Sequence, residues 1–195
     1  MNHIITEPTS TAQWHSLVHE AEDIAHQQLS ETLESYLVFT LIRFTRCPEL
    51  ANAILGIEFL ESMQRSGARR ARTLRDVGDK CLLFSGLFPH LAKRRRVRSS
   101  YFVDLGRSAY FEVHNTSAAA DSSLYRELAR EFVAMSDVLN TLRSLDQSKP
   151  ELDPLSAYEL WEDTDSQFAR KAVTRRTERG SEVTLFKAAP NSTPH

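Results

Sequence analysis

A chain of 195 residues, 41% hydrophobic and 26% charged, has the size and composition of one globular domain, which argues against a disordered or fibrous protein. Its longest apolar run, residues 36–42, is far shorter than the roughly 20 residues of a membrane-spanning helix, and the N-terminus lacks a signal-peptide pattern. We therefore expect a cytoplasmic protein. Cys47 and Cys81 have no CxxC spacing, so we expect reduced thiols rather than a disulfide framework or a zinc finger.

Helical periodicity dominates the first third of the chain. Residues 11–28 place six apolar side chains on one helix face, namely Trp14, Leu17, Val18, Ala21, Ala25 and Leu29. Residues 30–45 are apolar almost all round, which is typical of a central helix surrounded by others. Pro48 suits the first position of a third helix, and Gly67 suits its C-terminal cap.

The rest of the chain predicts three or four more helices. Gly86 and Pro89 end a helix over residues 68–85. The others cover residues 100–114, 118–145 and 154–170, and the second of these keeps its leucines on a near-heptad line. The sequence thus predicts an all-α, single-domain bundle of six or seven mostly antiparallel helices. The domain covers residues 11–172, between flexible segments at residues 1–10 and 173–195.

Charge is distributed unevenly along a chain whose formal net charge is only −2. Residues 65–107 contain twelve basic and three acidic side chains, half of all the Lys and Arg, whereas residues 1–64 contain two basic and nine acidic ones. The basic residues occur in two bursts, GARRARTLR and LAKRRRVR. Such an asymmetry indicates an anionic partner.

The second burst predicts an anion site. It precedes a helix expected to begin near Ser99 or Ser100, and cations are disfavoured at a helix N-terminus, so something negative should lie nearby. A phosphate would be bound by the free backbone N–H groups, the serine hydroxyls and the guanidinium groups. The predicted site residues are Arg94, Arg95, Arg96, Arg98, Ser99 and Ser100, with Arg69, Arg70 and Arg72 as second choices for the same surface.

Neutralisation within the fold is the alternative interpretation of these arginines. If the predicted third and fourth helices are antiparallel about Gly67, Arg72 and Arg75 come within reach of Glu61 and Glu58. Such exposed pairs contribute little to stability. Arg43, inside the apolar run, likewise needs a carboxylate or carbonyl partner, because burying it alone is costly.

A histidine and carboxylate set supports a competing, metal-dependent hypothesis. Helix-forming glutamates and histidines build di-iron and di-manganese sites in helical bundles. The candidate ligands are His19, Glu22, His26, Glu34, Glu58 and Glu61, which converge if the first three helices fold back on one another. The set lacks the second Glu-x-x-His pair that such sites use, because Glu58-x-x-Glu61 stands in its place.

A protein partner is the third alternative. Tyr158, Leu160 and Trp161 lie among acidic residues, and tyrosine and tryptophan are favoured anchors of interfaces. The predicted helix over residues 118–145 could also pair with its copy in a homodimer.

Phosphate-binding glycine loops, nucleophile elbows and the H-E-x-x-H motif do not occur in the chain, and no cofactor is indicated. We therefore expect a non-catalytic intracellular binding or regulatory protein with a basic surface for an anionic partner, such as a nucleic acid or a phosphate-bearing ligand. The alternatives are a carboxylate-histidine metal enzyme and a protein–protein adaptor.

Overall fold

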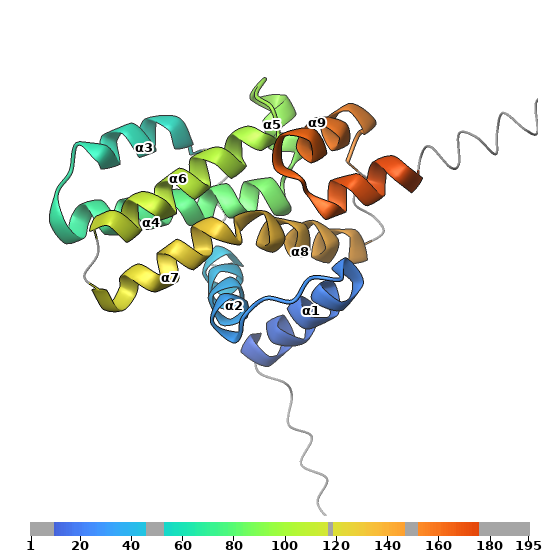
Figure 1. Cartoon of the computed structure of the whole chain (residues 1–195), viewed down its shortest axis with the longest axis horizontal. Coiled ribbons are helices and arrows are strands. Elements are labelled where there is room, and N and C mark those ends of the chain that lie inside the picture. The colour runs from blue at the N-terminus through green and yellow to red at the C-terminus, as the bar shows by residue number, and fades with distance from the viewer. Residues whose placement is uncertain (1–9, 46–52, 117–118, 147–151, 176–195) are drawn as a thin grey trace, which may run out of the picture.

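The computed structural model of the protein describes residues 10–45, 53–116, 119–146 and 152–175, and every regular element in these ranges is helical. Figure 1 labels α1 (Ser10–Ala25), α2 (Glu31–Thr45), α3 (Leu55–Met63), α4 (Gly67–Gly86), α5 (His90–Arg94), α6 (Ser100–Thr116), α7 (Ala119–Arg130), α8 (Phe132–Leu145) and α9 (Pro154–Thr164). A further helix covers residues 167–175. The all-α class is confirmed, although these ranges contain ten helices rather than six or seven. None of the described helices combines the length and apolar character of a membrane span.

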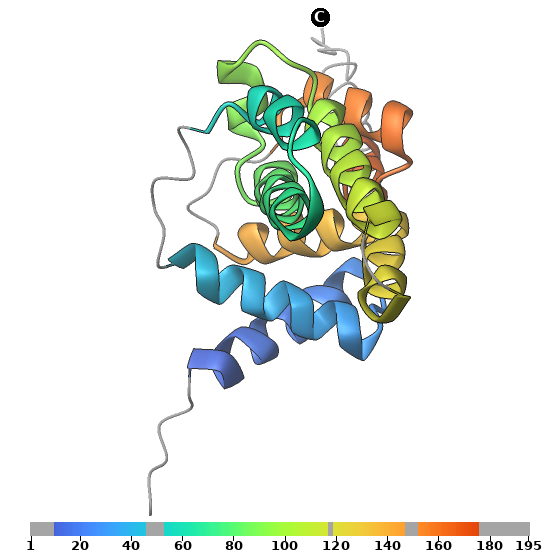
Figure 2. The ribbon, with the colours of Figure 1, turned by 90° about the vertical axis from the view of Figure 1, so that its left-hand side faces the viewer.

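The antiparallel helices α4 and α6 form the centre of the molecule (Figure 1). On one side α3 covers this pair, and on the opposite side α8, α2 and α1 follow (Figure 2). The core between these layers is built from large, fully buried side chains, among them Leu37, Phe84, Phe102, Tyr110 and Phe132. Burial of this apolar surface is the main driving force for folding.

α1 and α2 pack against each other, and α1 also packs against α8. Glu22 is buried on the inner face of α1, and its Oε1 accepts a hydrogen bond from the backbone N–H of Leu29 at 2.9 Å, which fixes the connection to α2. Burial raises the pKa of Glu22 because the charged form loses its hydration. α2 is mostly covered, as expected, but Phe39 on its outer side is 61% exposed.

Glycine, proline and aspartate mark several observed helix ends. Gly67 has a φ of 57° at the start of α4, a left-handed conformation that glycine adopts without strain. Asp153 caps α9 by accepting a hydrogen bond from the backbone N–H of Ser156 at 3.1 Å, and Pro154 follows as predicted. α3 begins at Leu55, and Pro48, the predicted start of that helix, lies outside the described residues.

The prediction of one long helix over residues 118–145 is wrong. The chain bends at Glu131, because α7 packs on α6 whereas α8 packs on α1 and α4. On the apolar line along these helices, Leu128, Met135 and Val138 are fully buried within the fold. The pairing of two copies through this line stays a prediction. The short helix α5 was not predicted either.

The predicted domain limits are only partly covered by the described ranges. Residues 167–175 are helical, so the helical part of the chain continues past residue 172. Residues 1–9 and 176–195, most of the two predicted flexible segments, lie outside the described residues.

Candidate functional site

The second basic burst forms a turn between α5 and α6, which we call the basic turn and define as Lys93–Arg98. Lys93 and Arg94 are in the last turn of α5, Arg95 is its C-cap, and Arg96 has a left-handed φ of 56°. Cations are favoured at the C-terminal end of a helix, so the first half of the turn is compatible with its charge. Arg94 and Arg96 are exposed, and Arg95 is half-buried.

Two of the four arginines of the basic turn have partners among the residues that the structure describes. Arg95 Nη1 donates a hydrogen bond to the carbonyl oxygen of Ala53 at 2.6 Å, and its guanidinium lies 5.1 Å from the ring centroid of Phe84. Arg98 Nη1 lies 3.3 Å from Asp163 Oδ1 on α9, and its Nε lies 4.0 Å from Glu159 Oε1. These side chains are held in place by the fold.

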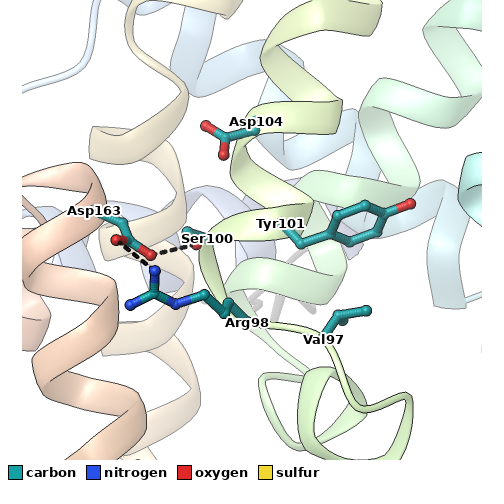
Figure 3. A pocket seen from close by; sticks show the side chains of 6 residues that line it. All are labelled: Val97, Arg98, Ser100, Tyr101, Asp104 and Asp163. Carbon is teal, nitrogen blue, oxygen red and sulfur yellow. Dashed lines mark hydrogen bonds and ion pairs between the residues drawn. The ribbon is translucent and has the colours of Figure 1, made fainter.

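The start of α6 differs from the predicted phosphate site, because a carboxylate of the protein lies there. Ser99 and Ser100 are buried, and the Ser100 hydroxyl donates a 2.6 Å hydrogen bond to Asp163 Oδ2 (Figure 3). Asp163 thus accepts contacts from Ser100 and Arg98 that were expected to bind a phosphate. For this half of the site, the alternative interpretation applies, in which the positive charge is neutralised within the fold.

A hollow of about 540 Å³ lies beside this contact, and Figure 3 shows six of the side chains that line it. Asp163 and Asp104 contribute carboxylates to its wall, while Arg98 contributes a single guanidinium, already paired with Asp163. Two carboxylates repel an anion at short range. This hollow is therefore a poor place for a phosphate.

The exposed cations of the basic turn are Lys93, Arg94, Arg96 and Arg98, of which Arg98 is paired with Asp163. Within the described ranges, no carboxylate lies at ion-pair distance from Arg94 or Arg96. Lys93 is close enough to Asp153 to contribute to lowering its pKa, after the larger effect of the hydrogen bond that Ser156 donates to Asp153. The available positive charge of the turn therefore centres on Arg94 and Arg96.

The first basic burst is at the other end of α4. Arg69 is seventeen residues before Gly86, the last residue of α4, which corresponds to about 26 Å along the helix. The structure thus places Arg69, Arg70 and Arg72 at the end of α4 far from Gly86, after which the chain leads to the basic turn. Arg69 and Arg72 are exposed, whereas Arg70 Nη2 is bound to Glu112 Oε2 on α6 at 2.6 Å.

The predicted ion pairs between α3 and α4 are displaced along α4. Glu58 Oε2 accepts a hydrogen bond from Lys80 Nζ at 2.5 Å rather than from Arg75. Arg75 instead faces Asp79 on its own helix, with a distance of 3.7 Å between Nε and Oδ2. α3 and α4 do turn back near Gly67, but their register differs from the sequence-based expectation.

The candidate metal ligands do not converge. Glu58 and Glu61 are on α3, on the opposite side of α4 from α1 and α2, where the other four candidates lie (Figures 1 and 2). Across the described part of the chain, no group of three or more His, Cys, Asp or Glu side chains is arranged to hold a metal ion.

The four candidates on α1 and α2, with the loop between them, also have other roles. Glu34 Oε1 lies 3.0 Å from Nδ1 of His15, not next to His26. The carboxylate of Glu22 is engaged by the backbone of Leu29, and His19 is largely exposed, 4.0 Å from Glu22. These contacts give the metal hypothesis no cluster of ligands.

A buried carboxylate that sequence reasoning did not single out lies at the centre of the fold. Asp79 on α4 is 1% exposed and accepts hydrogen bonds from the hydroxyls of Tyr36 on α2, at 2.6 Å, and Tyr110 on α6, at 2.7 Å. Arg43 Nη2 on α2 donates to Asp79 Oδ2 at 2.8 Å, and Arg43 Nη1 donates to Asp76 at 3.2 Å. We call Asp79, Tyr36, Tyr110 and Arg43 the Asp79 cluster. Arg43 thus has a carboxylate partner, one of the two kinds that the sequence predicted, although its own side chain is 43% exposed.

The Asp79 cluster joins three helices by polar contacts. Burial raises the pKa values of both tyrosines, so their hydroxyls remain protonated donors. The only sequence signal for this cluster is the arginine inside the apolar run, and nothing in the spacing of the residues identifies the two tyrosines.

The aromatic residues of α9 divide between the core and the surface. Leu160 is buried and Trp161 packs against the core, so these two candidate interface anchors close the end of the bundle. Tyr158 is half exposed and makes an edge contact with Trp161.

Comparison with protein-family models, with curated proteins and with solved structures found no match for the chain. The contacts and charges described above are therefore the basis for assigning a function.

Proposed function

We propose that the protein is a non-catalytic cytoplasmic binding protein that contacts an anionic partner through the basic turn. The observation that supports this most is that Arg94 and Arg96 are exposed and, among the described residues, have no ion-pair partner, on a turn that contacts with Ala53 and Asp163 hold in place. An unpaired cluster of cations gains more from an anionic partner than a neutralised one does.

The fold fixes the turn on which these cations are carried. Arg95 anchors it to Ala53, and Arg98 anchors it to α9 through Asp163. Because the backbone of the turn is held at both ends, little conformational entropy is lost when a partner binds. The long side chains of Arg94 and Arg96 can then follow the charge of the partner.

A salt titration with matched variants tests the proposal. The protein is titrated against labelled single-stranded RNA, duplex DNA and polyglutamate at several salt concentrations. The turn variant carries Arg94→Ser and Arg96→Asn, since asparagine tolerates the left-handed conformation at this position. The control variant carries Arg69→Ser and Arg72→Ser, which removes the same charge from exposed positions at the other end of α4.

We expect the logarithm of the affinity to fall linearly with the logarithm of the salt concentration. The turn variant should lose most of the affinity. For duplex DNA, the loss of two phosphate contacts reduces the slope by about 1.8. The control variant should keep the slope of the unmodified protein. Equal slopes for the two variants, or no binding to any polyanion at low salt, would contradict the proposal.

A further inference from the structure

An exposed apolar stripe lies next to the basic turn. Ile54, at the N-cap of α3, and Ile57 and Leu60 within it are 63%, 52% and 64% exposed, and their spacing of three residues places them along one side of the helix. Single exposed aliphatic side chains are common, but a run of three on one short helix forms a contiguous patch of the kind that marks interaction sites.

A hollow of about 480 Å³ connects the stripe with the basic turn. Its walls come from both elements: Ile54 and Gly56 from the start of α3, Arg95 and Val97 from the turn, and Tyr101 from α6. Arg95 reaches it in a fixed position, because Ala53 and Phe84 hold the guanidinium. The hollow is thus mostly apolar with one immobilised cation.

The shape of the hollow depends on the close approach of Tyr101 to α3. A Cβ atom at Gly56 would lie only 2.7 Å from the Tyr101 hydroxyl, so glycine is what allows the ring to form this wall. Figure 3 shows the ring directed away from Asp163. The two hollows share Val97 and Tyr101 but differ in charge.

We propose, on the basis of the proposed function, that the anionic partner is an acidic peptide segment with a bulky apolar side chain. The apolar side chain fills the hollow between Ile54 and Tyr101, further apolar contacts cover Ile57 and Leu60, and the carboxylates meet Arg94 and Arg96. This partner matches both parts of the surface, apolar along α3 and basic at the turn.

A nucleic acid matches the basic part and could stack a base on Tyr101, but it does not match the apolar stripe along α3. Its phosphates would contact Arg94 and Arg96, but unpaired bases bind by stacking on aromatic rings, and the stripe is aliphatic. An anionic membrane would satisfy both charge and apolar character, yet it would leave a hollow of this depth unfilled. A peptide side chain is the group that fits it.

Selection from a displayed library of random peptides tests the partner class on the full chain. We expect the enriched peptides to combine Asp or Glu with Leu, Ile, Phe or Trp. Synthetic copies of them should bind the turn variant, Arg94→Ser with Arg96→Asn, roughly ten-fold or more weakly. Ile54→Ser with Leu60→Ser should cost a similar factor, since each removes a buried aliphatic contact from the complex.

Phe39→Ser is the matched control, because Phe39 is as exposed as Ile54 but lies on α2, across the molecule from α3. It should leave peptide affinity unchanged. Thermal unfolding of each variant checks that the fold is retained, which exposed substitutions should allow.

Each contrary outcome has a separate meaning. Failure to enrich acidic, apolar peptides, or peptides that bind all variants equally, overturns the inference. If polyanions still bind through Arg94 and Arg96, the proposed function stands although the inference of a peptide partner fails. If polyanions do not bind there, both the proposed function and the inference fail. Three results together would assign the surface to a membrane instead. No peptides would be enriched, the protein would bind phosphatidylcholine vesicles only when phosphatidylserine is present, and the Ile54→Ser and Leu60→Ser variant would lose this binding.

Discussion

The Asp79 cluster and the basic turn use arginine in opposite ways. In the cluster, Arg43 contacts two carboxylates, and two tyrosine hydroxyls complete the shell of Asp79. In the turn, Arg94 and Arg96 face solvent, with no carboxylate of the described chain within ion-pair distance. The first arrangement joins helices, whereas the second leaves charge available to another molecule.

This difference shows that arginine content alone does not identify a binding surface. Asp163 neutralises Arg98, which belongs to the same burst as Arg94 and Arg96, and it also accepts a hydrogen bond from Ser100. What distinguishes the side chains is whether a neighbouring helix brings a carboxylate to them. Substitutions in the cluster should therefore affect stability, and substitutions in the turn should affect binding.

The largest effect is expected for Asp79→Ala. The substitution removes the buried acceptor of the Tyr36 and Tyr110 hydroxyls and of the Arg43 guanidinium, and breaking a buried ion pair typically costs about 3–5 kcal/mol. Urea unfolding measures the change, with Asp76→Ala as the control. Asp76 is partly exposed and, in the described part of the chain, forms an ion pair only with Arg43, so its loss should cost about 1 kcal/mol or less. Equal costs for the two variants would show that the cluster does not hold the helices together.

Gly78→Ala should destabilise the protein by an intermediate amount. A Cβ at this position would lie 2.5 Å from the ring of Tyr110, which would have to move away from Asp79. Such overpacking costs about 1–3 kcal/mol. Arg72→Ala, on an exposed face of the same helix, should change the unfolding free energy by less than about 0.5 kcal/mol. A neutral Gly78→Ala variant would mean that Tyr110 can shift without loss.

Glu22→Gln should give a smaller, pH-dependent effect. Burial raises the folded-state pKa of Glu22 above its unfolded value of about 4.3, so the glutamate contribution to the unfolding free energy falls as pH rises between these two values. Glutamine keeps the Oε1 acceptor for Leu29 and does not ionise. The unfolding free energy of the variant, relative to the unmodified protein, should therefore rise as the pH increases above about 4.3, until Glu22 is ionised in the folded state as well. A pH-independent difference would contradict the account of Glu22.

The smallest effect on stability is expected for the turn variant. Arg94→Ser with Arg96→Asn removes exposed side chains with no ion-pair partner in the described structure, so the unfolding free energy should change by about 0.5 kcal/mol or less. Chemical denaturation measures this directly. A loss comparable to that of Asp79→Ala would mean that the turn is a structural element and that the contrast between the two regions does not hold.

Local signals in the sequence were sufficient to predict the helical class and several boundaries. α4 spans Gly67–Gly86 where residues 68–85 were expected. Glycine at each end of the helix and Pro89 beyond it are strong signals of helix boundaries. The bend at Glu131 has no such signal, since neither glycine nor proline is near it. It arises because α7 and α8 pack against different helices, which is a property of the tertiary structure.

The candidate site was predicted in part. Exposure of Arg94 and Arg96 follows from a run of charge too dense to bury. The occupation of the start of α6 by Asp163, 63 residues away from Ser100, could not be predicted, because periodicity carries no information on which helices become neighbours. For the same reason, the pairing of Tyr36 and Tyr110 with Asp79 could not be predicted.

Arginine-specific modification with phenylglyoxal, mapped by mass spectrometry, tests most directly whether the basic turn offers free positive charge. The account predicts that Arg94 and Arg96 react much faster than Arg43 and Arg70, which are held by carboxylates, and that a bound polyanion protects them. Slow reaction at Arg94 and Arg96, or fast reaction that no polyanion suppresses, would contradict the assignment of the turn as the binding surface.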